Sequence, residues 1–493
     1  MQLTPSFRAL LPNFRPVFTA PAFRLFVLLL TGWALSSRHR FITECLFTAS
    51  QVGIGHWCRF HRFFSHYSWS LDDLSQILCR LLIQRFAADG PIPLAADDTL
   101  CRKRGLTIYG SGMHHDPLLS SRALKLFSWG HDWVVLALLV RRPWWAPTKV
   151  FALPLLCRLY TNRQGVTKGK KPKSRKKKGD PTAKKKWRRP PGSSHRTRPE
   201  LLVEMLKLLS TWFPDRQFVV CADTAYAGKS VLRQLPAQMD LISQVHPQGV
   251  LYAPPAPKVA KQRGAPRKKG ERLPNLQAWA EDTQQPWQEL TFDQYGLHTT
   301  LQVKVQQALY YTAGKDRRLT VVLTRDQTGK RPDHRFYCTR LDWEVRTILS
   351  AYADRWALEV TFEGAKQVLG LEDPANRVPK AVQRTAPMSL VLYSLVVWWF
   401  DLEGHRHVRF PQRPWYRRKR ETSFQDMVTT LRRLSWEEKI AEVVSLDGPH
   451  CRMGGRGGRV GRSCGVREPR SGSKLGGTAE DNTKLPRHQG GGR

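Results

Sequence analysis

The sequence predicts an α/β protein in which helical regions flank a strand-rich core. Apolar residues recur at three- and four-residue spacing over residues 70–86, which is typical of an amphipathic helix. From residue 91, short apolar runs alternate with turn residues, as strands do. The chain has 493 residues, 41% of them hydrophobic, which is enough for a sizeable core and more than one domain. The predicted regions are helical 1–88, core 89–235, β-rich 236–343, core 344–405, helical 406–450 and a tail, 451–493.

The first region, 1–88, is predicted to be helical. Ser70 is placed to cap the helix that begins before Asp72 and Asp73. Residues 56–64 mix aromatic and basic side chains, which suits either a DNA-binding module or an ordinary amphipathic bundle with basic edges. The apolar run 25–30 is too short to cross a bilayer, so we interpret it as a buried helix and expect no membrane partner.

The core region begins with three apolar runs that predict a strand meander, at 91–96, 133–140 and 150–160. Residues 168–198 then hold fifteen Lys or Arg and one acid, so we expect a disordered loop that can lie along DNA. A helix over 201–209 and a strand over 218–222 follow, and the strand ends at Asp223.

The β-rich insertion is predicted from four runs, at 245–252, 288–292, 301–305 and 319–323, interrupted by a Pro- and Lys-rich loop at 254–274. One long helix is expected over 342–371, and a buried helix over 388–400. The tail from residue 451 carries twelve Gly and ten Lys or Arg, so we expect it to be disordered.

The charge balance favours a nucleic-acid partner. The 80 Lys and Arg exceed the 40 Asp and Glu, which gives a net charge of +40. A field of this sign attracts polyanions, and its spread along the chain favours DNA over an acidic membrane surface. The nine cysteines include no C-x-x-C pair, so neither a disulfide framework nor a zinc site is indicated, and a reducing cytoplasm fits best.

The long predicted helix gathers four polar side chains on one face. Tyr352, Arg355, Glu359 and Lys366 fall within an arc of about 60° at helical spacing. A structural ladder of ion pairs would give the same pattern, because Arg355 and Glu359 are ordinary helix neighbours.

Two further acids follow apolar strands. Asp98 comes after the run 91–96, and Asp223 comes after 218–222. Acids from adjacent strands and from a helix packed on the sheet can converge, and three carboxylates repel one another unless cations join them. Two Mg²⁺ or Mn²⁺ ions at such a site would support phosphoryl transfer. The alternative is that each Asp caps the next element.

Four motifs carry a resemblance over roughly residues 20–400. The order of elements resembles the ribonuclease H-like fold of the DDE transposases, and the spacing of Tyr352, Arg355, Glu359 and Lys366 is similar to the Y-R-E-K signature of bacterial insertion-sequence transposases. The other matching blocks are Asp97-Asp98-Thr99 with Lys103-x-Gly105, Gly130-His131-Asp132-Trp133-Val134-Val135, and Cys221-Ala222-Asp223-Thr224-Ala225-Tyr226.

The resemblance implies roles for these residues. Asp98, Asp223 and Glu359 match the catalytic triad that binds two Mg²⁺ (or Mn²⁺) ions in this family, with Asp97 as the alternative to Asp98. Tyr352, Arg355 and Lys366 match positions that contact DNA phosphates. No base-stacking residue is assigned among Trp279, Trp287 and Trp343.

The implied activity is cut-and-paste transposition of an insertion sequence by a metal-dependent endonuclease with strand-transfer activity. Its partners would be double-stranded DNA, namely terminal inverted repeats and target, and a second copy in a synaptic homodimer. The expected location is the bacterial cytoplasm, at the nucleoid. The alternatives are a non-enzymatic DNA-binding protein, a nuclease or resolvase without strand transfer, and an inactive transposase remnant.

Overall fold

A computed structural model describes residues 2–50, 56–162, 195–257, 265–411, 414 and 419–446, apart from Arg122, Tyr295 and Lys330. Residues 168–194 of the predicted basic loop lie outside the described residues, and so does the whole predicted tail, 451–493. The elements described below belong to one compact unit, Met1–Val443, apart from the last three residues of the final helix.

The core is built on five neighbouring strands in the order β4-β3-β1-β5-β6. The first three pair antiparallel, which confirms the predicted meander. After helix α6 (Arg198–Trp212), β5 returns parallel to β1, and β6 lies parallel to β5. This mixed sheet fits a ribonuclease H-like core. The strands are β1 (Ile92–Arg102), β3 (Phe127–Arg141), β4 (Val150–Tyr160), β5 (Phe218–Ala222) and β6 (Met239–Gln244).

Strand β1 is longer than predicted, and this changes the position of its acids. The prediction ended the strand at residue 96, but pairing with β3 continues through Asp97, opposite Val135, and Asp98, opposite Val134. Both acids therefore lie inside the strand and not after it. Because side chains alternate along a strand, the two point to opposite faces of the sheet.

The strands of the predicted β-rich insertion continue the same sheet. In the described part of the chain the sheet has ten strands, and beyond β6 the order is β10-β9-β8-β7. The strand predicted at 245–252 is wrong. The strand in this part of the chain, β6, ends before residue 245, and Tyr252 forms only isolated bridges to Arg272 and Leu309. Three strands lie where none is predicted: β2, β6 and β10. The bounds are β2 (Gly112–His115), β7 (Gln288–Gln294), β8 (Leu297–Leu309), β9 (Arg318–Arg325) and β10 (His334–Cys338).

Different helices cover the two faces of β1. Leu94 and Ala96 belong to the large core that includes α6, whereas Ala95 belongs to a second core that includes α11. The single helix predicted over 342–371 is wrong, because it is broken at Arg355, where the backbone N–H bonds back to the carbonyl of Tyr352. The two resulting helices are α10 (Val345–Asp354) and α11 (Trp356–Gln367).

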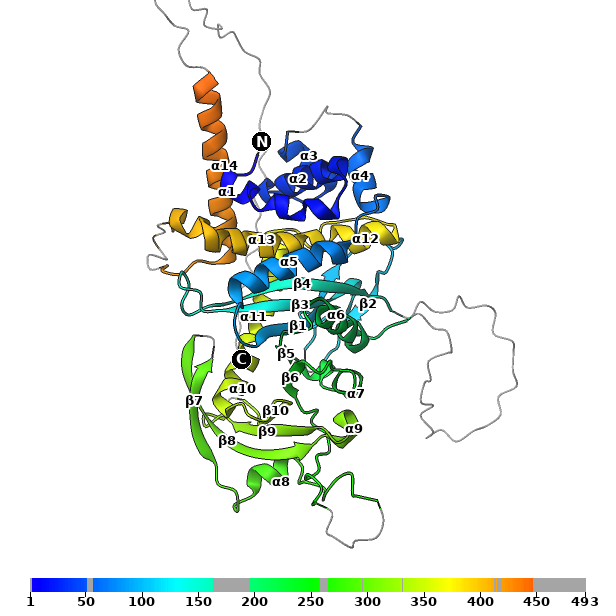
Figure 1. Cartoon of the computed structure of the whole chain (residues 1–493), viewed down its shortest axis with the longest axis vertical. Coiled ribbons are helices and arrows are strands. Elements are labelled where there is room, and N and C mark those ends of the chain that lie inside the picture. Colours follow the sequence, from blue (N-terminus) through cyan, green and yellow to red (C-terminus); the bar gives the residue numbers. More distant parts are fainter. Residues whose placement is uncertain are drawn as a thin grey trace, which may run out of the picture. The chain divides into compact units, whose positions relative to one another are not determined.

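The N-terminal helices lie against the segment that follows α11 and leads into α12 and α13 (Figure 1). Trp33 donates to the carbonyl of Leu369, and Arg384 on α12 (Pro379–Thr385) donates to the carbonyl of Tyr67, just after α4 (Cys58–Ser65). Ser70 caps α5 through the backbone N–H groups of Asp72 and Asp73, as predicted. The helices are α1 (Pro5–Arg8), η1 (Leu11–Val17), α2 (Ala20–Leu35), α3 (Ile42–Thr48), α4 (Cys58–Ser65) and α5 (Leu71–Phe86).

Helix α13 (Pro387–Leu402) forms the apolar centre between these helices and the sheet. It packs on β4 and contacts α2 and α5. Together with α12 it is the one described stretch that is long and apolar enough to cross a membrane, but 94% of its apolar window is buried inside the protein, as in a core helix. The remaining helices are η2 (Thr224–Tyr226), α7 (Lys229–Leu232), α8 (Leu276–Glu281), α9 (Tyr311–Gly314), α12 (Pro379–Thr385), η3 (Gly404–His407) and α14 (Phe424–Leu446).

Candidate active site

The α11 side of β1 presents an acid, a guanidinium and a second acid in contact. Arg355, at the break between α10 and α11, pairs with Asp97 through one nitrogen, and its Nη2 lies 3.3 Å from Oε1 of Glu359. The side chains of Arg355 and Asp97 are 13% and 15% exposed. The break in the helix therefore places Arg355 between a strand acid and a helix acid.

Asp223 stands directly after β5, next to β1 in the sheet. Its Oδ1 accepts a hydrogen bond of 2.8 Å from the N–H of Ala225, so it caps the short helix η2. Its backbone carbonyl accepts a hydrogen bond from the hydroxyl of Ser243 on β6. The capping role considered from the sequence is thus present, and it fixes the carboxylate at the end of the strand while leaving Oδ2 for other contacts.

The electrostatics connect these acids. Burial raises the pKa of Asp97 to about 7, and the charges of Asp98 and Asp223 add to this effect while Arg355 opposes it. Burial also raises the pKa of Asp223 and that of Glu359, which Asp223 raises further. Burial alone would lower the pKa of Arg355, but the negative charges around it, Asp97 first, raise it. One cation is thus shared electrostatically by three acids.

The acids suit a hard metal ion, and Arg355 occupies that place in this arrangement. Carboxylate oxygens are the donors that Mg²⁺ and Mn²⁺ prefer. Across the described ranges, no three His, Cys, Asp or Glu side chains are grouped so as to hold a metal as they stand. The guanidinium of Arg355 lies between Asp97 and Glu359 and supplies the positive charge there. Among the described atoms, its buried Nε has no hydrogen-bond partner. Metal binding would require Arg355 to give way.

Asp98 faces the opposite side of the sheet. Its Oδ1 accepts a hydrogen bond of 2.8 Å from the hydroxyl of Tyr226, and its Oδ2 lies 3.3 Å from Nε of Arg198. Burial raises the pKa of Asp98 to about 6, and the nearby charge of Asp132 raises it as well. The structure therefore brings Asp97, not Asp98, against Arg355 and Glu359.

The residues expected to contact DNA lie around the same helices. Tyr352 on α10 packs edge-on against Phe336 of β10. Lys366 on α11 donates a hydrogen bond of 2.8 Å to the carbonyl of Leu100 on β1. Both cations of the sequence signature, Arg355 and Lys366, are thus engaged with β1 in this state.

Three further polar residues near the site were not singled out from the sequence. Asp132 and Tyr226 fall within two of the motifs but have no predicted role of their own, and Arg198 falls within the predicted basic loop. Arg198 is instead the first residue of α6. A capping box indicates this start, since Oε2 of Glu200 accepts from both the N–H and the hydroxyl of Thr197, at 2.8 and 2.9 Å.

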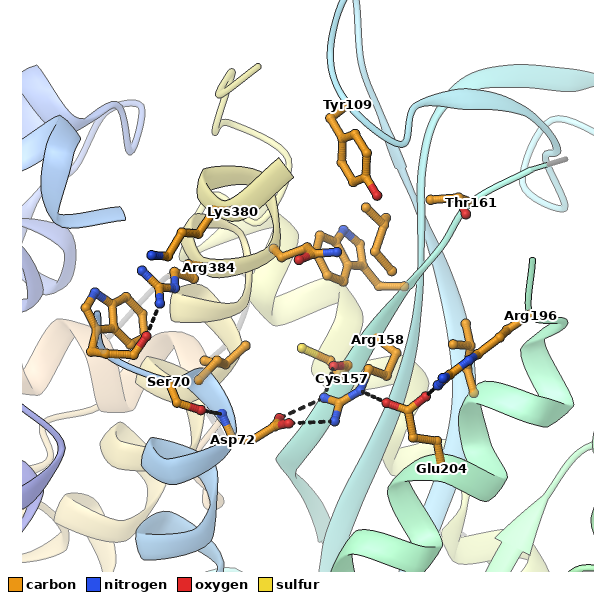
Figure 2. A pocket seen from close by; sticks show the side chains of 16 residues that line it. Ser70, Asp72, Tyr109, Cys157, Arg158, Thr161, Arg196, Glu204, Lys380 and Arg384 are labelled. Carbon is orange, nitrogen blue, oxygen red and sulfur yellow. Dashed lines mark hydrogen bonds and ion pairs between the residues drawn. The ribbon is translucent and has the colours of Figure 1, made fainter. Parts of the chain in front are cut away.

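A cavity of about 640 Å³ opens at the edge strand β4, and Asp97, Asp223 and Glu359 do not line it. Figure 2 shows Arg158 between Asp72 and Glu204, with nitrogen–oxygen distances of 2.9 Å to each. These three residues come from β4, α5 and α6, so this ion cluster joins the N-terminal helices to the core.

The tryptophans considered for base stacking are engaged within the protein. Trp279 is 2% exposed and donates to Oε1 of Gln285 at 2.7 Å. The ring of Trp287 is covered by Lys304 and Arg325, at 4.9 and 4.4 Å from its centroid. Trp343 packs in the small core beneath α10.

A mixed sheet of this order, with buried acids on β1 and directly after β5, is the arrangement expected of a ribonuclease H-like nuclease. The chain belongs to the DDE superfamily endonucleases, because the model of that family matches residues 13–315, more than half of the chain. This family places it among endonucleases of transposase type that use divalent metal ions.

Other comparisons are more distant. The chain is similar to a chain in the cryo-EM structure of the piggyBac transposase synaptic complex with hairpin DNA, at 12% identity and a TM-score of 0.37, covering 91% of this chain and 79% of that one. None of the curated proteins matches the chain.

Proposed function

We propose that the chain is a DNA transposase that cuts an insertion sequence from its flanking DNA and joins it to a target. The observation that carries the proposal is the position of Arg355, which is paired with Asp97 and Glu359 and lies in the field of Asp223. Family membership supports endonuclease chemistry. We therefore assign Asp97, Asp223 and Glu359 as the residues that would hold two Mg²⁺ or Mn²⁺ ions, in preference to the set with Asp98.

Bound ions would neutralise phosphate charge and activate the attacking water. The chain's own residues hold the ions and orient the phosphodiester. Arg355, Lys366 and Tyr352 lie along α10 and α11 beside the acids, and cations there can grip phosphates without reading the base sequence. The freed 3′-hydroxyl would then attack the opposite strand or target DNA. We expect a homodimer that pairs two element ends, acting on bacterial chromosomal DNA in the cytoplasm.

Glu359→Gln tests this function. The change keeps the size of the side chain and removes its charge, so we expect end-containing DNA to be bound but not nicked in Mg²⁺. The matched control is Glu363→Gln, one turn along the same helix, where the exposed carboxylate accepts a hydrogen bond of 3.1 Å from Gln367. Near-normal cutting by Glu359→Gln would reject the assignment. Binding without cutting by the unmutated chain would favour the non-enzymatic or inactive alternatives. Joined product would exclude a nuclease without strand transfer.

A further inference from the structure

Asp98 lies in a polar cluster on the α6 face of the sheet that the proposed chemistry does not use. Its members are Asp98 on β1, Asp132 on β3, Arg198 on α6, Tyr226 on η2 and His114 on β2. Arg198 pairs with both Asp98 and Asp132 and lies over the ring of Tyr160, with its guanidinium carbon 4.6 Å from the ring centroid. The cluster therefore joins three strands and two helices on the face of the sheet opposite Asp97.

The deepest part of the cluster is enclosed. The side chains of Asp132 and His114 are 2% and 1% exposed, and Nδ1 of His114 lies 3.7 Å from Oδ2 of Asp132. A buried carboxylate is costly to leave unpaired. Arg198 supplies the pairing charge for Asp132 and is thereby held in place against β3, from where it also reaches Asp98.

Tyr226 connects this cluster to the segments that carry Asp97 and Asp223. It is fully buried and is the last residue of η2, the short helix that Asp223 caps. Its hydroxyl donates to Asp98, whose chain neighbour is Asp97. The Asp98–Tyr226 hydrogen bond thus spans the two segments that carry Asp97 and Asp223.

We infer that Asp98 is a positioning residue, held by Arg198, that fixes β1 against the η2 turn through Tyr226 and so sets the separation of Asp97 and Asp223. The inference rests on the proposed function, because it assigns those two acids to metal binding. Groups that orient metal ligands contribute to affinity without touching the ion, and their loss typically weakens binding by about 10- to 100-fold.

The test measures Mn²⁺ affinity by calorimetry on the full chain without DNA, alongside kcat and KM for cleavage of end DNA. Asp97→Asn removes a proposed ligand and is expected to abolish Mn²⁺ binding. Tyr226→Phe removes one hydroxyl and is expected to weaken Mn²⁺ binding about 10-fold or more, and to lower kcat with little change in KM. Tyr310→Phe, which removes a mostly buried phenol hydroxyl outside the cluster, is the control and should leave both unchanged.

Variants of Arg198 distinguish a positioning role of this cluster from a purely structural one. Arg198→Lys keeps the charge and is expected to restore most of the Mn²⁺ affinity that Arg198→Met loses, whereas the unfolding midpoints of the two variants guard against misfolding. If Tyr226→Phe binds Mn²⁺ like the wild type, the inference is overturned. It is also overturned if Asp98→Asn abolishes binding while Asp97→Asn retains it, since Asp98 would then be the ligand. Cleavage that survives Asp97→Asn, Asp98→Asn and Glu359→Gln together would instead reject the proposed function.

Discussion

Arg355 and Asp97 form an ion pair on the α11 face of the sheet although 258 positions separate them in the chain. The pair joins the break between two helices to the middle of the central strand. Because Glu359 lies on the same guanidinium, one buried cation is shared by an acid of β1 and an acid of α11. Under the proposed function, the side chain of Arg355 would compete with the metal for these two acids.

Replacing Arg355 with Met should destabilise the metal-free protein and strengthen its response to metal. Removing one partner of a buried ion pair costs about 3–5 kcal/mol, and since Glu359 is 36% exposed we expect about 2–3 kcal/mol here. Urea unfolding in EDTA and in Mg²⁺ measures both effects. Arg340→Met, which breaks a pair with the 69%-exposed Asp342, is the control. Equal stabilisation by Mg²⁺ in the variant and the wild type would contradict competition between Arg355 and Mg²⁺ for Asp97 and Glu359.

Lys366→Gln tests whether this lysine contacts DNA phosphate. We expect weaker binding of end DNA and a slope of log K against log salt that is smaller in magnitude by about 0.9, the effect of one lost phosphate contact. Lys229→Gln, at an exposed position on α7, is the control. An unchanged slope would restrict Lys366 to its observed role, the hydrogen bond to the carbonyl of Leu100.

Arg384→Met should loosen the N-terminal helices from the core. Arg384 is 9% exposed, donates to the carbonyls of Tyr67 and Trp69, and lies 4.4 Å from the ring centroid of Trp69. Since each buried carbonyl left unpaired costs about 1–3 kcal/mol, the free energy of unfolding should fall by about 2–4 kcal/mol. Lys380→Met, exposed on the same helix, should change it by less than about 0.5 kcal/mol. A loss no larger than in this control would refute the anchoring role.

Asp116→Asn should lower stability in a pH-dependent way. The hydrogen bond from Arg102 is the main cause that lowers the pKa of Asp116 to about 2, and Ser128 adds to it. A lowered folded-state pKa stabilises the protein above the ordinary value of 3.8, and this contribution disappears as the pH falls towards 2. We expect a wild-type advantage of about 2 kcal/mol at neutral pH, from about 1.4 kcal/mol per pKa unit.

Unfolding titrations between pH 2 and pH 7 would follow this difference for Asp116→Asn, with the exposed Asp89→Asn as the control. A difference that stays constant down to the acid end would show that the charge of Asp116 is not what stabilises the fold.

Local patterns in the sequence were sufficient for several elements. The helix after Ser70 and the strands β4 and β5 lie where the periodicity and the apolar runs predict them. In each case the signal is carried by neighbouring residues: a capping hydroxyl, a 3.6-residue repeat, or an apolar run between turn residues. The strand predicted at 245–252 failed because the chain turns within it: the N–H of Gly249 bonds back to the carbonyl of His246, and Tyr252 forms only isolated bridges.

The sequence by itself determined which residue types are available: the acids Asp97, Asp98, Asp223 and Glu359, the cations of α10 and α11, and a strong positive charge. Only the tertiary structure decided how they meet. Pairing with β3 extends β1 through both aspartates, and the alternation of its side chains sends Asp97 to Arg355 and Asp98 to Arg198. A shift of one residue in that register would exchange the two acids. The register depends on contacts with distant segments of the chain, which no local pattern encodes.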